Sequence, residues 1–103
     1  MPLDLVAAEH QKKIDGTRPV FSLEEGFHAE LLASAIPGKD FPVVTKISDY
    51  YADNVILFGE LEDFRKELFL IAGKSGGKER FSALLSFVDK AIAERDNLYV
   101  YAD

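Results

Sequence analysis

The sequence predicts an α+β fold, with about four strands in a largely antiparallel sheet and three or four amphipathic helices packed on one face. Three observations predict this class. Strand-like and helix-like hydrophobic periodicities both occur, they follow one another in the order ββα(α)βααβ, and 103 residues is the usual length of one domain. We therefore expect a single α+β domain over residues 1–103.

The first two strands are expected at residues 3–8 and 18–23, on either side of an Asp15-Gly16 turn. The first segment begins with alternating apolar and polar residues, and Asp-Gly is a strong hairpin signal. Pro19 has no N–H to donate, so the second strand should lie at a sheet edge or turn that position outward. An antiparallel hairpin with an irregular loop is the expected result.

The first helix is expected to follow the hairpin directly. Ser22 and Glu25 have the spacing of a capping box, and Leu23, Phe27, Leu31 and Ala35 recur at helical spacing up to a Pro37-Gly38 stop. Residues 42–51 come next and are ambiguous. They are rich in β-branched residues, so they fit an extended chain or a short helix entered at Pro42; we favour the helix.

The second half of the chain contains four further elements. They are expected as a strand at 54–58, a helix at 60–72, a helix at 79–94 and a strand at 98–101. Gly73 has the position of a residue just past a helix end, which leaves residues 73–78 as a connecting loop. That loop resembles a phosphate-binding loop in composition, but it follows a helix and has Leu68 where the first glycine of the motif is required. We interpret it as a solvated connection.

Composition excludes several classes of function. The absence of cysteine removes disulfides, thiolate catalysis and zinc or iron–sulfur sites built on cysteine, and it favours a reducing compartment. No signal peptide or bilayer-length apolar run is present, so a cytoplasmic protein is expected. The net charge of −6 disfavours nucleic acid and anionic membranes as partners, and it favours encounter with a basic protein.

No motif predicts a catalytic, metal or cofactor site. The histidines lack metal-ligand spacing, no serine lies in a nucleophile elbow, and the glycines form no dinucleotide fingerprint. His28 lies four residues after Glu24 on the first expected helix, a spacing that allows an acid–base pair. A small ligand-binding domain or enzyme with a cleft near His28 is therefore one alternative, although an ordinary helix flank has the same appearance.

An acidic, tyrosine-containing surface is the strongest functional lead. Tyrosine provides a large contact area at low entropic cost, and carboxylates pair with Arg and Lys of a partner. If Leu98 and Val100 face the helices, Tyr99 and Tyr101 lie on the open face of the sheet. The candidate partner-binding residues are Asp49, Tyr50, Tyr51, Asp53, Glu60, Glu62, Asp63, Tyr99 and Tyr101.

The sequence therefore favours a small, non-enzymatic interaction domain that binds a basic protein. In size, charge and mixed α/β character it resembles small immunity proteins and inhibitors that neutralise basic nucleases, without a motif that assigns it to them. A third alternative is a homodimer or other homo-oligomer, formed through an uncovered sheet face or through a strand edge at residues 98–101.

Overall fold

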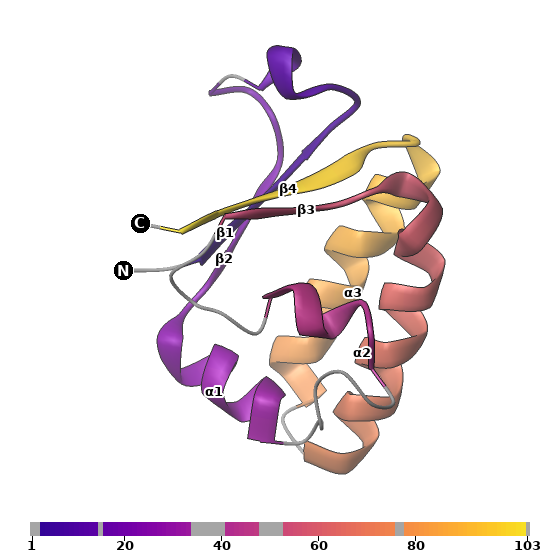
Figure 1. Ribbon diagram of the computed structural model, residues 1–103. Coiled ribbons are helices and arrows are strands. Elements are labelled where there is room, and N and C mark those ends of the chain that lie inside the picture. The colour runs from indigo at the N-terminus through magenta and orange to yellow at the C-terminus, as the bar shows by residue number, and fades with distance from the viewer. Residues whose placement is uncertain (1–2, 15, 34–40, 48–52, 76–77, 103) are drawn as a thin grey trace.

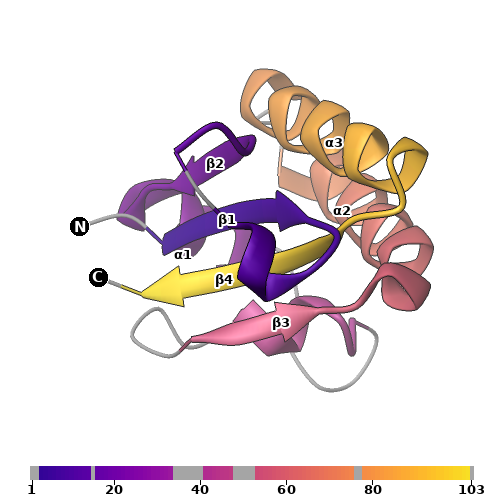
Figure 2. The same cartoon turned by 90° about the horizontal axis from the view of Figure 1, so that it is seen from above.

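The computed structural model describes residues 3–14, 16–33, 41–47, 53–75 and 78–102. Four strands form one antiparallel sheet in the order β2-β1-β4-β3, and three α-helices lie against one of its faces (Figures 1 and 2). The strands are β1 (Leu3–Ala8), β2 (Val20–Leu23), β3 (Asn54–Ile56) and β4 (Asn97–Ala102). The helices are α1 (Glu25–Ala33), α2 (Leu61–Ser75) and α3 (Lys78–Ala93), with short 3₁₀ helices η1 (Gln11–Lys13), η2 (Val44–Ile47) and η3 (Phe58–Glu60). The predicted fold class and order of elements are confirmed.

The core lies between the sheet and the helices. Leu5 of β1 and Leu98 and Val100 of β4 point into it and are almost completely buried. The helices contribute apolar side chains at spacings of three and four residues, as expected of one buried face. On α2 and α3 these are Leu61, Phe64, Leu68, Ile71, Phe81, Leu84, Val88 and Ala91.

The predicted N-terminal hairpin is confirmed, because β1 pairs with β2 in antiparallel register with Leu5 opposite Phe21. Its connecting loop carries η1 and projects beyond the sheet on the side away from the helices (Figure 1). The prediction of an edge at residues 98–101 is wrong. β4 lies between β1 and β3 and pairs with both, so the two sheet edges are β2 and β3.

The capping box predicted for Ser22 is also wrong. Ser22 belongs to β2, and its hydroxyl donates to Asp4 Oδ1 of the neighbouring strand at 2.8 Å. The backbone N–H of His28 donates to the carbonyl of Glu24 at 2.8 Å, so α1 begins after Glu24. Strand pairing has drawn Ser22 into the sheet, and the expected stop at Pro37-Gly38 lies outside the described residues.

The boundary predicted at Gly73 is wrong as well, since α2 continues through Gly73 to Ser75 and α3 starts at Lys78. Packing of α2 along α3 offsets the cost of about 1 kcal/mol for a glycine within a helix. In the ambiguous segment, the helical interpretation is confirmed for the single turn of η2, Val44–Ile47. Residues 48–51 lie outside the described part of the chain.

The C-terminal end of α3 forms a Schellman motif. Arg95 has a φ of 57°, and its N–H donates to the carbonyl of Ile92 at 3.1 Å. The N–H of Asp96 donates to the carbonyl of Ala91 at 2.9 Å. These bonds satisfy carbonyls that the helix end leaves unpaired, and they turn the chain from α3 into β4.

Candidate functional site

The sheet face opposite the helices carries two rows of side chains. Strand register places Val20, Val6, Tyr99 and Val55 side by side across all four strands. A second row contains Ser22, Asp4 and Tyr101, and Asp53 lies beside it at the start of β3. We call these eight residues the tyrosine face. Figure 2 shows the order of the strands that carry it. One row is apolar and the other is polar and acidic.

The expected orientation of Tyr99 and Tyr101 is confirmed. Leu98 and Val100 are buried in the core, whereas both tyrosines lie half-buried on the opposite face. Asn97 Nδ2 donates to the hydroxyl of Tyr99 at 3.3 Å. The tyrosine rings are therefore positioned by β4, which pairs with β1 on one side and with β3 on the other.

A shallow hollow of about 280 Å³ brings three of the predicted residues together. It is lined by Asp53, Asn54, Val55, Tyr99, Val100 and Tyr101. Asp53 Oδ1 accepts the backbone N–H of Ala102 at 2.7 Å, which extends the β3–β4 ladder by one bond made through a side chain. Asp53 is thus held in place beside the tyrosines while its side chain remains exposed.

The remaining predicted acids do not join this cluster. Glu60 lies 2.6 Å from Lys46 Nζ, and the hydrogen bond with Lys46 lowers the pKa of Glu60. Glu62 and Asp63 are exposed in the first turn of α2, beyond the far end of β3 from Asp53. A three-residue strand spans about 10 Å, so the acids bracket β3 and form two separate groups. Asp49, Tyr50 and Tyr51 lie outside the described residues.

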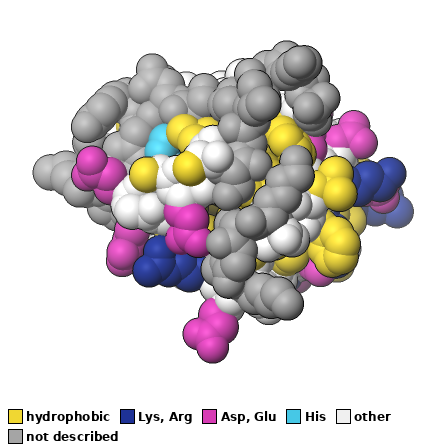
Figure 3. Space-filling view, turned by 90° about the horizontal axis from the view of Figure 1, so that it is seen from below, with side chains coloured by type: hydrophobic (Ala, Val, Ile, Leu, Met, Phe, Trp, Pro, Cys, Tyr) yellow, Lys and Arg dark blue, Asp and Glu magenta, His cyan; other side chains and the backbone are white. Residues whose placement is uncertain are grey.

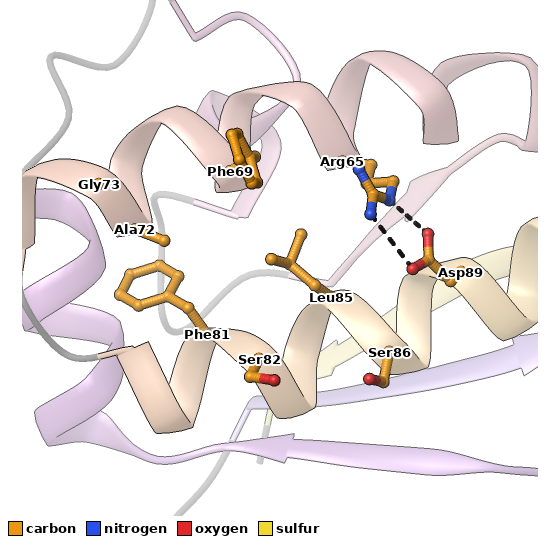
Figure 4. Close-up of a pocket in the computed structure, with 9 residues that line it drawn as sticks. All are labelled: Arg65, Phe69, Ala72, Gly73, Phe81, Ser82, Leu85, Ser86 and Asp89. Carbon is orange, nitrogen blue, oxygen red and sulfur yellow. Dashed lines mark hydrogen bonds and ion pairs between the residues drawn. The ribbon is translucent and has the colours of Figure 1, made fainter.

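A larger groove of about 500 Å³ runs between α2 and α3. Figure 4 shows Phe81 and Leu85 pointing from α3 toward α2, with Phe69 opposite them. An ion pair between Arg65 and Asp89 joins the two helices at one end of the groove. The bond with Asp89 raises the pKa of the Arg65 guanidinium.

This groove was not predicted, although the sequence contains a signal for it. Phe69 and Leu70 fall outside the apolar stripe of α2, and both are exposed, at 62% and 59%. Large apolar residues off the buried stripe mark a helix surface that is not covered by the core. Figure 3, which views the molecule from below, shows hydrophobic side chains next to Lys and Arg side chains at the right of the picture.

His28 is buried on α1, and its Nε2 lies 2.6 Å from the carbonyl oxygen of Ile47. The ring therefore links α1 to η2. The hollow at Asp53, the groove between α2 and α3 and a hollow beside Phe21 of β2 are all lined by other residues. Among the described residues, no group of three or more His, Asp or Glu side chains is arranged to hold a metal ion.

Comparison with family models, with curated proteins and with solved structures finds no match for this chain. No helix within the described ranges is long and apolar enough to cross a bilayer. Geometry and charge therefore carry the functional argument.

Proposed function

We propose that the protein is a non-enzymatic interaction domain that binds a basic segment of a protein partner through the tyrosine face. The observation that supports this proposal is the hollow shared by Asp53, Tyr99 and Tyr101 on the sheet face opposite α1, α2 and α3. The net charge of −6 adds long-range attraction for a basic partner.

The chemistry of this hollow suits an Arg or Lys side chain. A guanidinium stacks on tyrosine rings and bonds carboxylates in the same plane. Asp53 Oδ1 accepts the N–H of Ala102, and the carboxylate keeps its negative charge at the rim of the hollow, where a partner's cation can reach it. Neighbouring Val55, which also lines the hollow, supplies apolar contact for the stem of a long side chain.

A role in neutralising a basic enzyme, as small immunity proteins and inhibitors do, is one function of this class. The absence of cysteine favours a reducing compartment, and we place the encounter in the cytoplasm. This assignment rests on charge and surface chemistry alone.

The test compares variants at the two ends of β3. Asp53→Asn keeps an acceptor for the N–H of Ala102 but removes the charge, and Tyr101→Ala removes one ring. The protein is used to capture partners from lysate, the captured protein is identified and purified, and its affinity is measured by calorimetry. We expect each variant to weaken binding about tenfold or more, with the effect of Asp53→Asn reduced by salt.

Glu62→Gln is the matched control, because it removes an exposed carboxylate at the other end of the strand. It should change the affinity less than about twofold. If the control weakens binding as much as Asp53→Asn does, only net charge matters and the tyrosine face is not the site. Unchanged binding of the Tyr101→Ala variant contradicts the proposal directly.

A further inference from the structure

The outer edge of β2 presents unused backbone groups. In the β1–β2 pair, the N–H of Ala7 donates to the carbonyl of Pro19 at 3.0 Å, and the register continues with Leu5 opposite Phe21. Alternate pairs of an antiparallel ladder exchange hydrogen bonds. The backbone of Phe21 therefore points toward β1, and the N–H and C=O groups of Val20 and Ser22 point away from the sheet.

These four groups have no hydrogen-bond partner among the described residues. Val20 is 51% exposed and Ser22 is exposed, so solvent reaches both residues that carry these groups. An edge strand with open donors and acceptors is a template for another strand.

We propose that a second copy of this chain pairs with β2 in antiparallel orientation, about a two-fold axis that passes beside Phe21. In this register Val20 lies opposite Ser22 of the partner subunit, and Ser22 lies opposite the partner's Val20. All four open groups of each strand then form hydrogen bonds. The pairing is self-complementary, as a two-fold interface requires, and it joins the two sheets into one of eight strands.

A hollow beside β2 accommodates the side chain at the centre of this interface. It has a volume of about 280 Å³ and is lined by Phe21, Ser22, Glu24, Phe27, Arg80 and Ala83. Phe21 lies at its wall, with its ring centroid 6.5 Å from that of Phe27. In the proposed register the partner's Phe21 lies directly opposite Phe21 in a closely spaced pair. Its ring would enter this aromatic hollow.

Charge is complementary at the ends of the paired strands. The same register places the exposed Glu24 opposite Arg18 of the partner subunit, and symmetry repeats this pair. Two of the five N–H donors of Arg18 bond the carbonyl of Ala7 and Asp96 Oδ2, at 2.9 and 2.8 Å. The arginine is thereby held at the start of β2, where an incoming carboxylate can reach it.

The first test measures mass by sedimentation equilibrium on the full chain. An interface formed by one short pair of strands is small and therefore weak, so protein concentrations from about 10 µM to 1 mM are required. We expect the mass to rise from 11.5 kDa toward twice that value. Val20→Pro removes the outward N–H without touching a bond to β1, and it should raise the dissociation constant at least about tenfold.

Val55→Pro is the matched control at the other edge. The N–H of Val55 also points away from the sheet, where it donates to Asn54 Oδ1 at 2.8 Å. This variant should dimerise as the wild type does. A wild type that stays monomeric at about 1 mM, or a Val20→Pro variant that dimerises normally, overturns the proposal.

The second test uses amide hydrogen exchange and covers the case in which Val20→Pro does not fold. Raising the wild-type concentration should slow exchange of the Val20 and Ser22 amides at least about tenfold while leaving Phe21 unchanged, because Phe21 already bonds β1. Glu24→Lys should weaken dimerisation about fivefold at low salt and have no effect at high salt. Protection at Val55 in place of Val20 and Ser22 would show that copies associate elsewhere, which overturns the β2 assignment.

Discussion

The two edges of the sheet differ in how their backbone groups are satisfied. At β3, the N–H of Val55 donates to Asn54 Oδ1, and its carbonyl accepts from Lys46 Nζ at 3.3 Å. At β2, Val20 and Ser22 have no such partners among the described residues. Proteins commonly blunt their edge strands with charged or polar side chains. One edge here is closed in that way and the other is left open, so the open edge is where association is expected.

Each edge is also anchored by an ion pair, and the two pairs differ in burial. Arg18 and Asp96 hold the start of β2, and the side chain of Asp96 is only 6% exposed. Lys46 and Glu60 hold β3, and both of their side chains are about one-third exposed, at 32% and 31%. Buried pairs cost more to break than exposed pairs, because the remaining charge is left without compensation.

The largest effect is expected from Arg18→Met at the β2 anchor. It removes the bond to the carbonyl of Ala7 and leaves the buried carboxylate of Asp96 unpaired. We expect the free energy of unfolding at pH 7 to fall by about 3 kcal/mol, measured by urea titration. Asp96→Asn in the same background should restore part of the loss, since it removes the uncompensated charge.

The pH dependence of this variant follows from the pKa of Asp96. Burial raises that pKa above 3.8, and Arg18 acts in the opposite direction. A carboxyl with a raised folded-state pKa costs no stability at low pH and destabilises the fold as pH rises past the unfolded value. Without Arg18 that cost increases, so the deficit of Arg18→Met should be largest at pH 7 and shrink toward pH 4. An equal deficit at both values would contradict this account.

The next largest effect is expected at Glu67, which holds the helix that closes the β3 edge. Glu67 Oε1 accepts the N–H groups of Val43 and Val44 at 3.0 and 2.9 Å, and the side chain is buried. Glu67→Ala leaves two buried donors unpaired, and we expect a loss of about 2 kcal/mol. Because η2 carries Lys46, the same variant should speed amide exchange at Val55.

Glu67→Gln separates the hydrogen bonds from the charge. Its amide oxygen can accept both N–H groups, so it should be at least as stable as the wild type at pH 7. Burial raises the pKa of Glu67 above 4.5, so the wild type should lose stability as pH rises through that region. The free energy of unfolding of the Gln variant should not show this decrease with rising pH. A Gln variant as unstable as Glu67→Ala would show that the charge itself is required.

Much of the fold was predictable from the sequence, but the difference between the edges was not. Periodicity located the strands and predicted the outward direction of Tyr99 and Tyr101, and Pro19 indicated an edge. Periodicity does not specify which strands are neighbours in the sheet. The sequence therefore predicts an edge at residues 98–101, whereas β4 is a central strand. Glu67 looks like an ordinary residue on a helix flank, because the N–H groups that it accepts come from a segment 23 and 24 residues away.

A smaller effect is expected from Lys46→Met, which opens the β3 edge at one backbone group, the carbonyl of Val55. It removes the ion pair with Glu60 and the bond to the carbonyl of Val55. For a partly exposed pair we expect a loss of about 1 kcal/mol, measured by urea titration. If open backbone groups are what permit pairing, this variant should also form species larger than a dimer at high concentration. A stable variant with an unchanged association profile would show that the bond from Lys46 does not protect β3.

An effect of similar size but opposite sign is expected from Arg95→Gly. Arg95 has a φ of 57°, in the left-handed region that glycine adopts without steric cost. Glycine should preserve the Schellman bonds and raise the free energy of unfolding by about 1 kcal/mol, measured by thermal and urea unfolding. Arg95→Ala is the control and should give little or no gain, because it retains a Cβ. Neither variant alters the outward N–H and C=O groups of Val20 and Ser22. If either variant changed the dissociation constant of the dimer, dimer formation would depend on overall stability and not on the open edge of β2.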